Sequence, residues 1–553
     1  MPIVRTKLDT LMRLTNVSDV ETLKNALFNL KCESEVGEDG TIAVEVQSDR
    51  IDMFSVEGIA SAIKLYLGLE KPVFIQLKDL YFKVFVKPPT KRPYIAVAAV
   101  TNVNLDDEKL KLLIEFQERL HVTFGRNRRK VAIGLHDLDK LPSPTLEYKD
   151  INIDETYMIP LHDFREMSIR KVIEMTEQGM LYGSLALNEN MHPAILSKGK
   201  VISLPPVINS DITRLTENTR NILIDVTGTD VNAVHAVLNS IVHALSFYGG
   251  DVLGAEIIYP NISEVTPDLR PRVVRVDLKF VSEWLGIGRG QLLQIEPALN
   301  KMGYRVVTMT EKYMEVEVPY YRNDILHQVD VIEDMAIGIG YDNIGFEEVE
   351  PRLRIAKGLD LKSVVSIIRE TLVGLGYTEL NTLTLIPSQI VEELGFRDTA
   401  IIVNAPSNEI NAIRSNLFQS VIATLRSSQY IPQPVKVFEI GEVVLNCPSC
   451  YNKWKNELRV CWAIMDSETR FEDVHATLYS VLRELGLEGV FKLHPCKAEM
   501  FSKERCADIY LGNRVAGVMG EVHPEKLVKL GILYPVTLAE LSINILYSLL
   551  TNK

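Results

Sequence analysis

The sequence predicts an α+β protein of several domains, and three observations lead to this prediction. The chain has 553 residues, enough for roughly three to four domains that each bury a full core. Segments with the period-two pattern of strands alternate along it with segments that have helical spacing. Polar, proline-rich stretches typical of linkers occur at residues 87–93, 259–271 and 350–358. These linkers predict four domains, 1–87, 88–268, 269–350 and 351–553.

The individual elements follow from the same periodicities. In the second predicted domain, residues 94–101 form an apolar run typical of a buried strand, and a further strand is expected at 222–227. Residues 231–248 have the spacing of an amphipathic helix, and Asp230 in front of them is a potential N-cap. In the last predicted domain, residues 435–445 have the pattern of a strand.

The composition excludes several classes of protein. With 46% hydrophobic and 24% charged residues, the chain is expected to be an ordinary water-soluble globular protein. No apolar run reaches the roughly 18 residues of a membrane span, and the start lacks the layout of a signal peptide, so no membrane contact and a cytoplasmic location are expected. The formal net charge of −13 argues against nucleic-acid binding over the whole surface, because phosphate contacts need lysine and arginine. The basic segment 126–130 is open to three interpretations: an RNA contact, an exposed loop or a partner contact.

The cysteines give a further expectation about the compartment. Six cysteines in a chain of this length predict a reducing environment. Cys447 and Cys450 have the spacing of half a zinc site, but no second pair follows, so zinc is not expected. Whether these two residues have any role is left open.

A set of acidic residues follows a strand predicted from alternating apolar side chains. A helix capped by Asn323 or Asp324 is expected next, and Asp330, Glu333 and Asp334 fall on one side of it. Asp324 precedes this helix and can turn towards the same side. All-oxygen ligands suit magnesium or calcium, whereas zinc prefers thiolate and imidazole. The spacing thus allows a hard-cation site, but on spacing alone a solvated acidic helix face is the more common meaning of such a charge run.

These acids belong to a longer pattern, from Arg322 through Gly340–Ile344, that resembles the metal-binding module of the beta chain of phenylalanine-tRNA ligase. Further segments, in the order of that family, are similar to its amino-terminal signature, its editing domain and its last domain. They are Ser48–Asp52 with Glu57–Ala60, Ser203–Asn209 with Asp225–Asp230, and Val437–Gly441 with Gly520–Glu525. Together they span almost the whole chain, whose short length is similar to that of the archaeal and eukaryotic-cytosolic members.

The resemblance implies a heterotetramer of two alpha and two beta chains that attaches phenylalanine to tRNA(Phe) with ATP and magnesium. It implies a class II synthetase-like antiparallel sheet in the last domain, and Mg2+ ligands at Asp324, Asp330, Glu333 and Asp334. Class II adenylation needs one arginine on the ATP α-phosphate and another, late in the chain, over the adenine, because a planar guanidinium can both pair and stack. No arginine follows Arg514, so adenylation is expected on the alpha chain.

The resemblance also implies an editing pocket in 88–268 that hydrolyses tyrosine wrongly attached to tRNA(Phe). An apolar pocket rejects the added hydroxyl of tyrosine by only about 100-fold, so a second, polar pocket serves accuracy. Asp225 and Thr227 alternate along a predicted strand, and both side chains should therefore point to one face. With Ser203 and Asn209 from the neighbouring loop, they are the expected lining of this pocket. Structural roles in turns are the alternative for Asp225 and Asn209.

The group that positions the attacking water is left open, because the sequence has no nucleophile elbow and no zinc-protease motif. Two other functions compete with this one. The first is a non-editing scaffold or tRNA-binding protein with the same fold. The second is a free-standing magnesium-dependent phosphotransferase, which the sequence disfavours because Gly286–Gly290 lacks the Lys-Ser or Lys-Thr ending of a phosphate loop.

Overall fold

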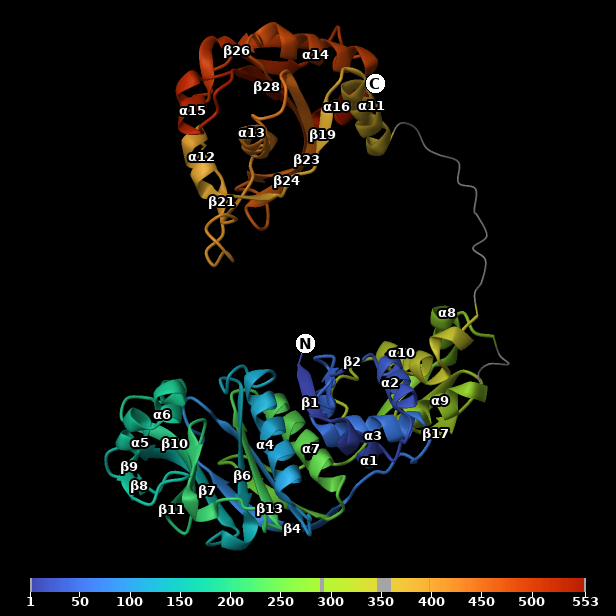
Figure 1. The fold of residues 1–553 in the computed structure, drawn as a ribbon, viewed down its shortest axis with the longest axis vertical. Helices are drawn as coiled ribbons and strands as arrows, with labels where there is room; N and C mark the ends of the chain where they lie inside the picture. Colours follow the sequence, from blue (N-terminus) through green and yellow to red (C-terminus); the bar gives the residue numbers. More distant parts are fainter. Residues whose placement is uncertain (1, 289–292, 346–359, 397, 552–553) are drawn as a thin grey trace. The chain divides into compact units, whose positions relative to one another are not determined.

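The computed structural model describes residues 2–288, 293–345, 360–396 and 398–551 (Figure 1). The chain divides into two units, 1–350 and 351–553. The division falls at the last predicted linker, 350–358, which lies outside the described residues. Both units contain helices and strands, so the prediction of an α+β protein with several domains is confirmed.

The first unit begins with a small α+β layer. Its three strands form an antiparallel sheet in the order β1-β3-β2. Helix α2 starts where the Asp19 carboxylate accepts the backbone N–H of Thr22, and α3 starts where the Ser55 hydroxyl accepts that of Gly58. The elements are β1 (Ile3–Lys7), α1 (Leu8–Thr15), α2 (Val20–Asn29), β2 (Glu33–Val36), β3 (Thr41–Glu45), η1 (Ile51–Phe54) and α3 (Val56–Tyr66).

A ten-stranded mixed sheet forms the largest part of the first unit. Its order is β12-β11-β10-β7-β4-β14-β5-β13-β6, and β15 pairs with β14. The sheet curls so that its two edge strands, β12 and β6, meet. The Asn209 side-chain amide of β12 donates a hydrogen bond to the Leu135 carbonyl of β6 at 3.1 Å. The strands are β4 (Leu77–Val86), β5 (Tyr94–Thr101), β6 (Val131–Asp137), β7 (Thr145–Asn152), β10 (Met191–Ser197), β11 (Lys200–Leu204), β12 (Ile208–Asn209), β13 (Ile222–Gly228), β14 (Asp251–Ile258) and β15 (Ser263–Thr266).

The two faces of this sheet are both buried. One face packs on its own apolar core, which includes Phe82, Val97 and Leu223. The other face lies under α4 (Asp107–Val122) and α7 (Val231–Ser246), which share the main core of the unit. The predicted N-cap of α7 is present, since the Asp230 carboxylate accepts the N–H of Ala233.

A small lobe follows β7 and has a separate core. Its helices start at hydroxyl caps, Ser168 for α5 and Thr176 for α6. The lobe consists of β8 (Tyr157–Met158), β9 (Met167–Ser168), α5 (Ile169–Met175), α6 (Glu177–Tyr182) and η3 (Gly183–Leu185). It lies beside β10 and β11 in Figure 1.

The last part of the first unit is a three-stranded antiparallel sheet with three helices. The sheet has the order β16-β18-β17, and its buried side chains join the main core, which extends from Val4 to Ile337. The elements are β16 (Arg272–Asp277), α8 (Leu278–Leu285), α9 (Ile295–Lys301), β17 (Arg305–Met309), β18 (Tyr313–Val318), α10 (Gln328–Ile339) and η6 (Tyr341–Asn343).

Two predicted boundaries need correction here. Helix α10 begins after His327, not after Asn323 or Asp324, because the His327 ring and the Asp330 carboxylate cap its first turn reciprocally. The linker at 87–93 is a loop of the large sheet, since β4 in front of it pairs in parallel with β14 and β7. A domain boundary in front of Leu77 therefore fits the strand pairing better than one at residue 87.

The second unit is built on a seven-stranded sheet with the order β19-β23-β24-β28-β27-β26-β25. The β19–β23 pair is parallel and the others are antiparallel. Helices α11 (Leu361–Gly374), α14 (Phe471–Glu484) and α16 (Ile543–Thr551) pack on one face, and α12 (Ser388–Leu394), α13 (Leu417–Ser427) and α15 (Pro524–Lys529) on the other. The strands are β19 (Thr378–Leu380), β23 (Val435–Asn446), β24 (Trp454–Met465), β25 (Phe491–Pro495), β26 (Phe501–Leu511), β27 (Arg514–Val522) and β28 (Val536–Ser542). A small sheet consists of β20 (Leu385–Ile386), β21 (Ala400–Ile401) and β22 (Ala412–Ile413).

The cysteines of the second unit differ from the expectation. Cys447 is bonded to Cys450, and Cys496 to Cys506, as two disulfides. The cysteine count therefore does not indicate a reducing compartment, because it cannot show which thiols are adjacent in space. Across the described ranges, no helix is both long and apolar enough to cross a membrane.

Candidate functional site

A cavity of about 640 Å³ lies in the first unit, where the two edge strands of the curled sheet meet. We call it the sheet-end cavity. Its walls include Gly134 of β6, Ser203 and Asn209 of β11 and β12, and Asp225 of β13. Helix α4 contributes a further wall through Gln117 and its neighbours. Three of the four residues predicted for an editing pocket thus share one cavity of the size typical for small-molecule sites.

Two of these residues also join the ends of the sheet. The Ser203 hydroxyl donates to the side-chain carbonyl of Asn209 at 3.1 Å. The Asn209 amide in turn donates to the Leu135 carbonyl. This pair fixes the width of the cavity, which agrees with the alternative that Asn209 holds a loop.

Asp225 differs from these two because one of its carboxylate oxygens is free. Oδ2 lies 2.7 Å from Nε2 of His136. Oδ1 is buried and has no hydrogen-bond partner among the described residues. Leaving a charged acceptor unpaired in the interior is costly, so an unpaired oxygen on a residue that borders a large cavity is a candidate acceptor for a hydrogen-bond donor of a ligand.

Thr227 does not line the cavity. Its side chain lies on the same side of β13 as that of Asp225, as alternation predicts, but it is fully buried and Oγ1 has no partner in the described structure. The backbone carbonyl of Thr227 accepts a hydrogen bond from the buried guanidinium of Arg92 at 2.7 Å. Ala132, which pairs with Thr227 on β6, does line the cavity, so the pocket role of Thr227 stays a prediction, with a buried core position as the alternative.

Sequence reasoning missed His136, Thr213 and Gly134. His136 is fully buried on β6 and connects Asp225 to the Thr213 hydroxyl, which lies 2.7 Å from Nδ1. Gly134 stands opposite Asp225 in the strand pairing, and a methyl group there would overlap the Asp225 carboxylate. The available signal was a histidine and a glycine in an otherwise apolar strand, and it becomes specific only when the neighbouring strand is known.

The basic segment 126–130 forms part of the cavity wall. Arg128 donates to the carbonyls of Pro206 and Val207 at 3.2 and 3.1 Å and pairs with Glu118 at 2.8 Å. Burial alone raises the pKa of Glu118, but hydrogen bonds from His121 and the nearby Arg128 outweigh it and lower the pKa to about 2. The central arginine of the segment is thus held by the protein, while its neighbours Arg126 and Arg129 are exposed.

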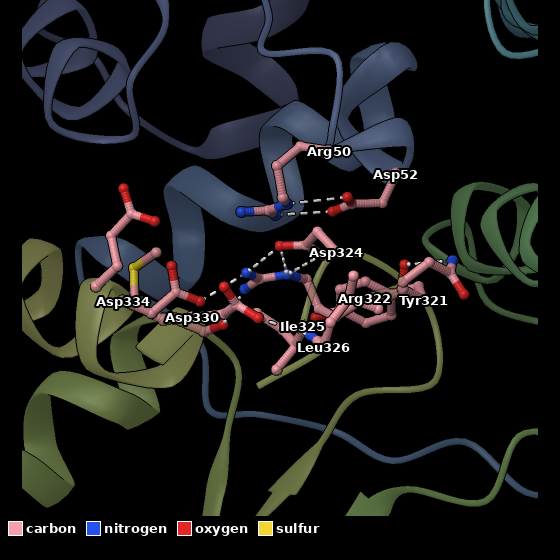
Figure 2. A network of polar contacts seen from close by, with 12 residues as sticks. Arg50, Asp52, Tyr321, Arg322, Asp324, Ile325, Leu326, Asp330 and Asp334 are labelled. Atoms are coloured by element: carbon pink, nitrogen blue, oxygen red, sulfur yellow. Dashed lines mark hydrogen bonds and ion pairs between the residues drawn. The ribbon is translucent and has the colours of Figure 1, made fainter. Parts of the chain in front are cut away.

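The acids predicted to bind magnesium surround Arg322, and we call this group the Arg322 cluster (Figure 2). Figure 2 shows the guanidinium between Asp324 and Asp334, each of which accepts a hydrogen bond from Nη2 at 2.6 Å. The hydroxyl of Tyr304 donates to Asp334 as well, at 2.6 Å. Burial lowers the pKa of Arg322, but the two carboxylates outweigh burial and hold the pKa well above its usual value. Arg50, also seen in Figure 2, forms a separate buried pair with Asp52 at 2.8 Å.

The other two predicted ligands have partners of their own. Asp330 accepts the backbone N–H groups of Leu326 and His327, each at 2.7 Å, as part of the cap of α10. Glu333 pairs with Lys31 at 3.1 Å on the surface of the cluster. All four acids border one small cavity of about 40 Å³.

This arrangement does not fit a directly bound metal ion. Among the residues that the structure describes, no group of three or more His, Cys, Asp and Glu side chains is placed to hold one. Arg322 pairs with two of the carboxylates and Lys31 with a third, and buried charges without a metal ion need such partners. The magnesium site at these four residues stays a prediction that the geometry does not favour.

Comparisons with known proteins place the chain in a class. Residues 274–341 match the tRNA synthetase B5 domain, and residues 347–543 match the phenylalanyl tRNA synthetase beta chain CLM domain. The chain is therefore an aminoacyl-tRNA synthetase subunit.

Curated relatives identify the family within this class. The chain is 36% identical to the phenylalanine--tRNA ligase beta subunit of Sulfurisphaera tokodaii, over 98% of both chains. It is 39% identical to that of Aeropyrum pernix, over 99% of both. An N-terminal fragment of the phenylalanyl-tRNA synthetase beta subunit from Pyrococcus horikoshii is 33% identical, with a TM-score of 0.58, and covers 62% of this chain and 100% of the fragment. The chain belongs to the family of phenylalanine--tRNA ligase beta subunits.

Proposed function

We propose that this chain carries the editing activity of a phenylalanine-tRNA ligase, while an alpha subunit carries adenylation. The assembled enzyme is a cytoplasmic heterotetramer of two alpha and two beta chains that attaches phenylalanine to tRNA(Phe) with ATP and magnesium. This chain hydrolyses the ester of tyrosine wrongly attached to the same tRNA. The names of the relatives support a beta subunit with a partner chain.

The observation that carries the editing proposal is the free oxygen of Asp225. It is a buried, unpaired acceptor beside a cavity of about 640 Å³. Tyrosine offers a phenolic O–H to such an acceptor, and phenylalanine does not. A phenylalanyl ester in the same position leaves the carboxylate unpaired, and sites of this kind reject the analogue without the hydroxyl by about 10⁴-fold or more.

Hydrolysis balances without a protein nucleophile. Water adds to the ester carbonyl carbon, the bond between that carbon and the ribose oxygen breaks, and the ribose oxygen takes up a proton. In the proposal this chain contributes the cavity, which orients the ester, and Asp225, which selects the side chain. Orientation alone supplies a large part of the acceleration in reactions of this type. Magnesium enters the proposal only with ATP on the assembled enzyme, since the Arg322 cluster does not fit a bound ion.

The second unit is proposed to be a class II synthetase-like domain without ATP chemistry. Its mainly antiparallel sheet supports this. Two of its arginines also support it, because they pair with carboxylates of the sheet: the buried Arg414 with Glu439 and the partly buried Arg459 with Glu540, both at 2.7 Å. Arginines held in this way are not available for phosphate or adenine, and no arginine follows Arg514.

One experiment separates this function from its competitor, a non-editing scaffold with the same fold. The chain is co-expressed with an alpha subunit from the same source, and the purified complex is assayed for phenylalanine charging and for hydrolysis of tyrosyl-tRNA(Phe). The proposal predicts both activities in the complex and no phenylalanine-dependent pyrophosphate exchange by the beta chain alone. Charging without any hydrolysis of tyrosyl-tRNA(Phe) supports the scaffold.

A further inference from the structure

His136 is the only group described in contact with Oδ2 of Asp225. The distance between Nε2 and Oδ2 is 2.7 Å, and the distance between Nδ1 and the Thr213 hydroxyl is also 2.7 Å. His136 is fully buried, whereas Asp225 and Thr213 both border the sheet-end cavity. The imidazole thus lies in the protein interior behind the cavity wall, where it contacts two residues that line the cavity.

The chemistry of these contacts fixes the positions of the protons. An ionised carboxylate only accepts hydrogen bonds, so Nε2 of His136 must carry a proton and donate it to Asp225. A neutral imidazole then has a bare Nδ1, which accepts the hydrogen bond that the Thr213 hydroxyl donates. Thr213 therefore selects the tautomer that Asp225 requires. With a neutral imidazole and an ionised carboxylate, this order of hydroxyl, imidazole and carboxylate leaves one arrangement of donors and acceptors.

The same contacts fix the direction of the free oxygen. Because Oδ2 is held by His136, rotation of the carboxylate is restricted, and Oδ1 keeps its buried, unpaired position on a residue that borders the cavity. Gly134 provides the room for this orientation, since a side chain at that position would overlap the carboxylate. His136 and Gly134 lie on β6, on the same side as Asp225 of β13, so the register of two neighbouring strands builds the arrangement.

We propose that His136 is a positioning residue of the editing site, and that its Nε2–H, oriented by Thr213, holds Asp225 so that Oδ1 faces the substrate. This inference rests on the proposed editing function and adds to it the group that keeps the selecting carboxylate in place. His136 does not touch the substrate. His136 affects hydrolysis only through Asp225, and this effect depends on the N–H group at Nε2.

Two substitutions distinguish this role from that of a core residue that only fills space. Gln places an amide N–H near the position of Nε2, whereas Asn places its amide near Nδ1 and cannot reach Asp225. In the full-length complex, His136→Gln should keep hydrolysis of tyrosyl-tRNA(Phe) within a few-fold of the parent. His136→Asn should lower kcat/KM by about 10- to 100-fold, mainly through a higher KM, because the contact between Asp225 and the phenol is lost in the bound substrate and in the transition state alike. His192→Gln, which changes another fully buried histidine of the same sheet, is the matched control and should hydrolyse at the parent rate.

Parent-like hydrolysis by folded His136→Asn overturns the inference, and so do equal losses in His136→Asn and His136→Gln. A second measurement keeps the inference testable if neither variant folds or if the parent itself does not hydrolyse the ester. The ¹⁵N spectrum of histidine-labelled parent protein should show His136, assigned through the Asp225→Asn variant, with a protonated Nε2 and a bare Nδ1. The opposite tautomer contradicts the positioning role. A parent that shows the expected tautomer but no hydrolysis contradicts the proposed editing function and leaves the positioning of Asp225 intact.

Discussion

Both the sheet-end cavity and the Arg322 cluster contain buried aspartates, but the carboxylates at the two places have different hydrogen-bond partners. In the Arg322 cluster, Asp324 and Asp334 share one guanidinium, and Tyr304 donates to Asp334 as well. At the sheet-end cavity, Asp225 has one neighbour, His136, and one free oxygen. The cluster borders a cavity of about 40 Å³, and Asp225 one of about 640 Å³.

The difference separates an internal ion pair from a binding group. A buried carboxylate that is fully paired contributes to the specificity of the fold and has little left to offer a ligand. A buried carboxylate that borders a large cavity and has one unpaired oxygen is an unsatisfied acceptor, to which a ligand can donate a hydrogen bond. The comparison therefore supports the proposal that the acids of the cluster have a structural role and that Asp225 recognises the substrate.

The largest expected effect is on the stability of the first unit when Arg322 is lost. Arg322→Met leaves two buried carboxylates without their shared cation, and removal of one partner from such a group costs about 3 to 5 kcal/mol. Urea unfolding followed by a probe in the first unit measures the loss. The control is Arg126→Met, an exposed arginine of the same unit, which should stay within about 0.5 kcal/mol of the parent. If both variants unfold at the parent midpoint, Arg322 does not act as the internal cation.

The next effect is a dependence of stability on pH from His192. Burial lowers the pKa of this imidazole to about 4, so it stays neutral in the folded protein, whereas the unfolded chain binds a proton below its ordinary pKa of 6.5. The stability due to the neutral form is complete above pH 6.5 and is lost as the pH falls towards 4, by up to about 3 kcal/mol. Thermal scans between pH 7 and 4 should show a smaller decline in melting temperature for His192→Gln than for the parent. Equal declines in the two proteins contradict the assignment.

A smaller effect is expected at Thr227, which is fully buried and does not itself line the sheet-end cavity. Its buried hydroxyl has no partner, so Thr227→Val should be neutral or stabilise by up to about 1 kcal/mol. Hydrolysis of tyrosyl-tRNA(Phe) should stay at the parent rate. A loss of hydrolysis with an unchanged melting temperature supports the pocket role of Thr227.

The smallest effect is expected from magnesium on the isolated chain. Because Arg322 pairs with Asp324 and Asp334, and Lys31 with Glu333, removal of magnesium with a chelator should change the unfolding free energy by less than about 0.5 kcal/mol. Calorimetric titration with magnesium chloride provides the direct check. Stoichiometric binding that Asp324→Asn abolishes shows that the predicted metal site exists after all.

Local patterns in the sequence predicted several elements closely. The apolar run at 94–101 is β5, and the helix with Asp230 as its cap is α7. These succeed because alternation, helical spacing and capping are properties of neighbouring residues. The start of α10 was predicted too early, because His327 is an unusual cap that competes with Asn323 and Asp324.

The site was harder to predict because its contacts are distant in the sequence. Asp225 came from family resemblance, but its partner His136 lies 89 residues earlier and becomes visible only through the pairing of β6 with β13. In the same way, the acids of the cluster have the spacing of metal ligands, and no local pattern reveals that Lys31, 302 residues away from Glu333, neutralises one of them. Spacing identifies candidate ligands, whereas the cations beside them decide what they bind.

The most direct test of the central claim replaces Asp225 by Asn in the complete complex. The substitution keeps the shape of the side chain and removes the negative charge of the Asp225 carboxylate. The account predicts that phenylalanine charging is unchanged, that tyrosyl-tRNA(Phe) accumulates, and that its hydrolysis slows by about 10- to 100-fold. A folded Asp225→Asn complex that hydrolyses tyrosyl-tRNA(Phe) at the parent rate contradicts the claim that this carboxylate is the recognition group of the sheet-end cavity.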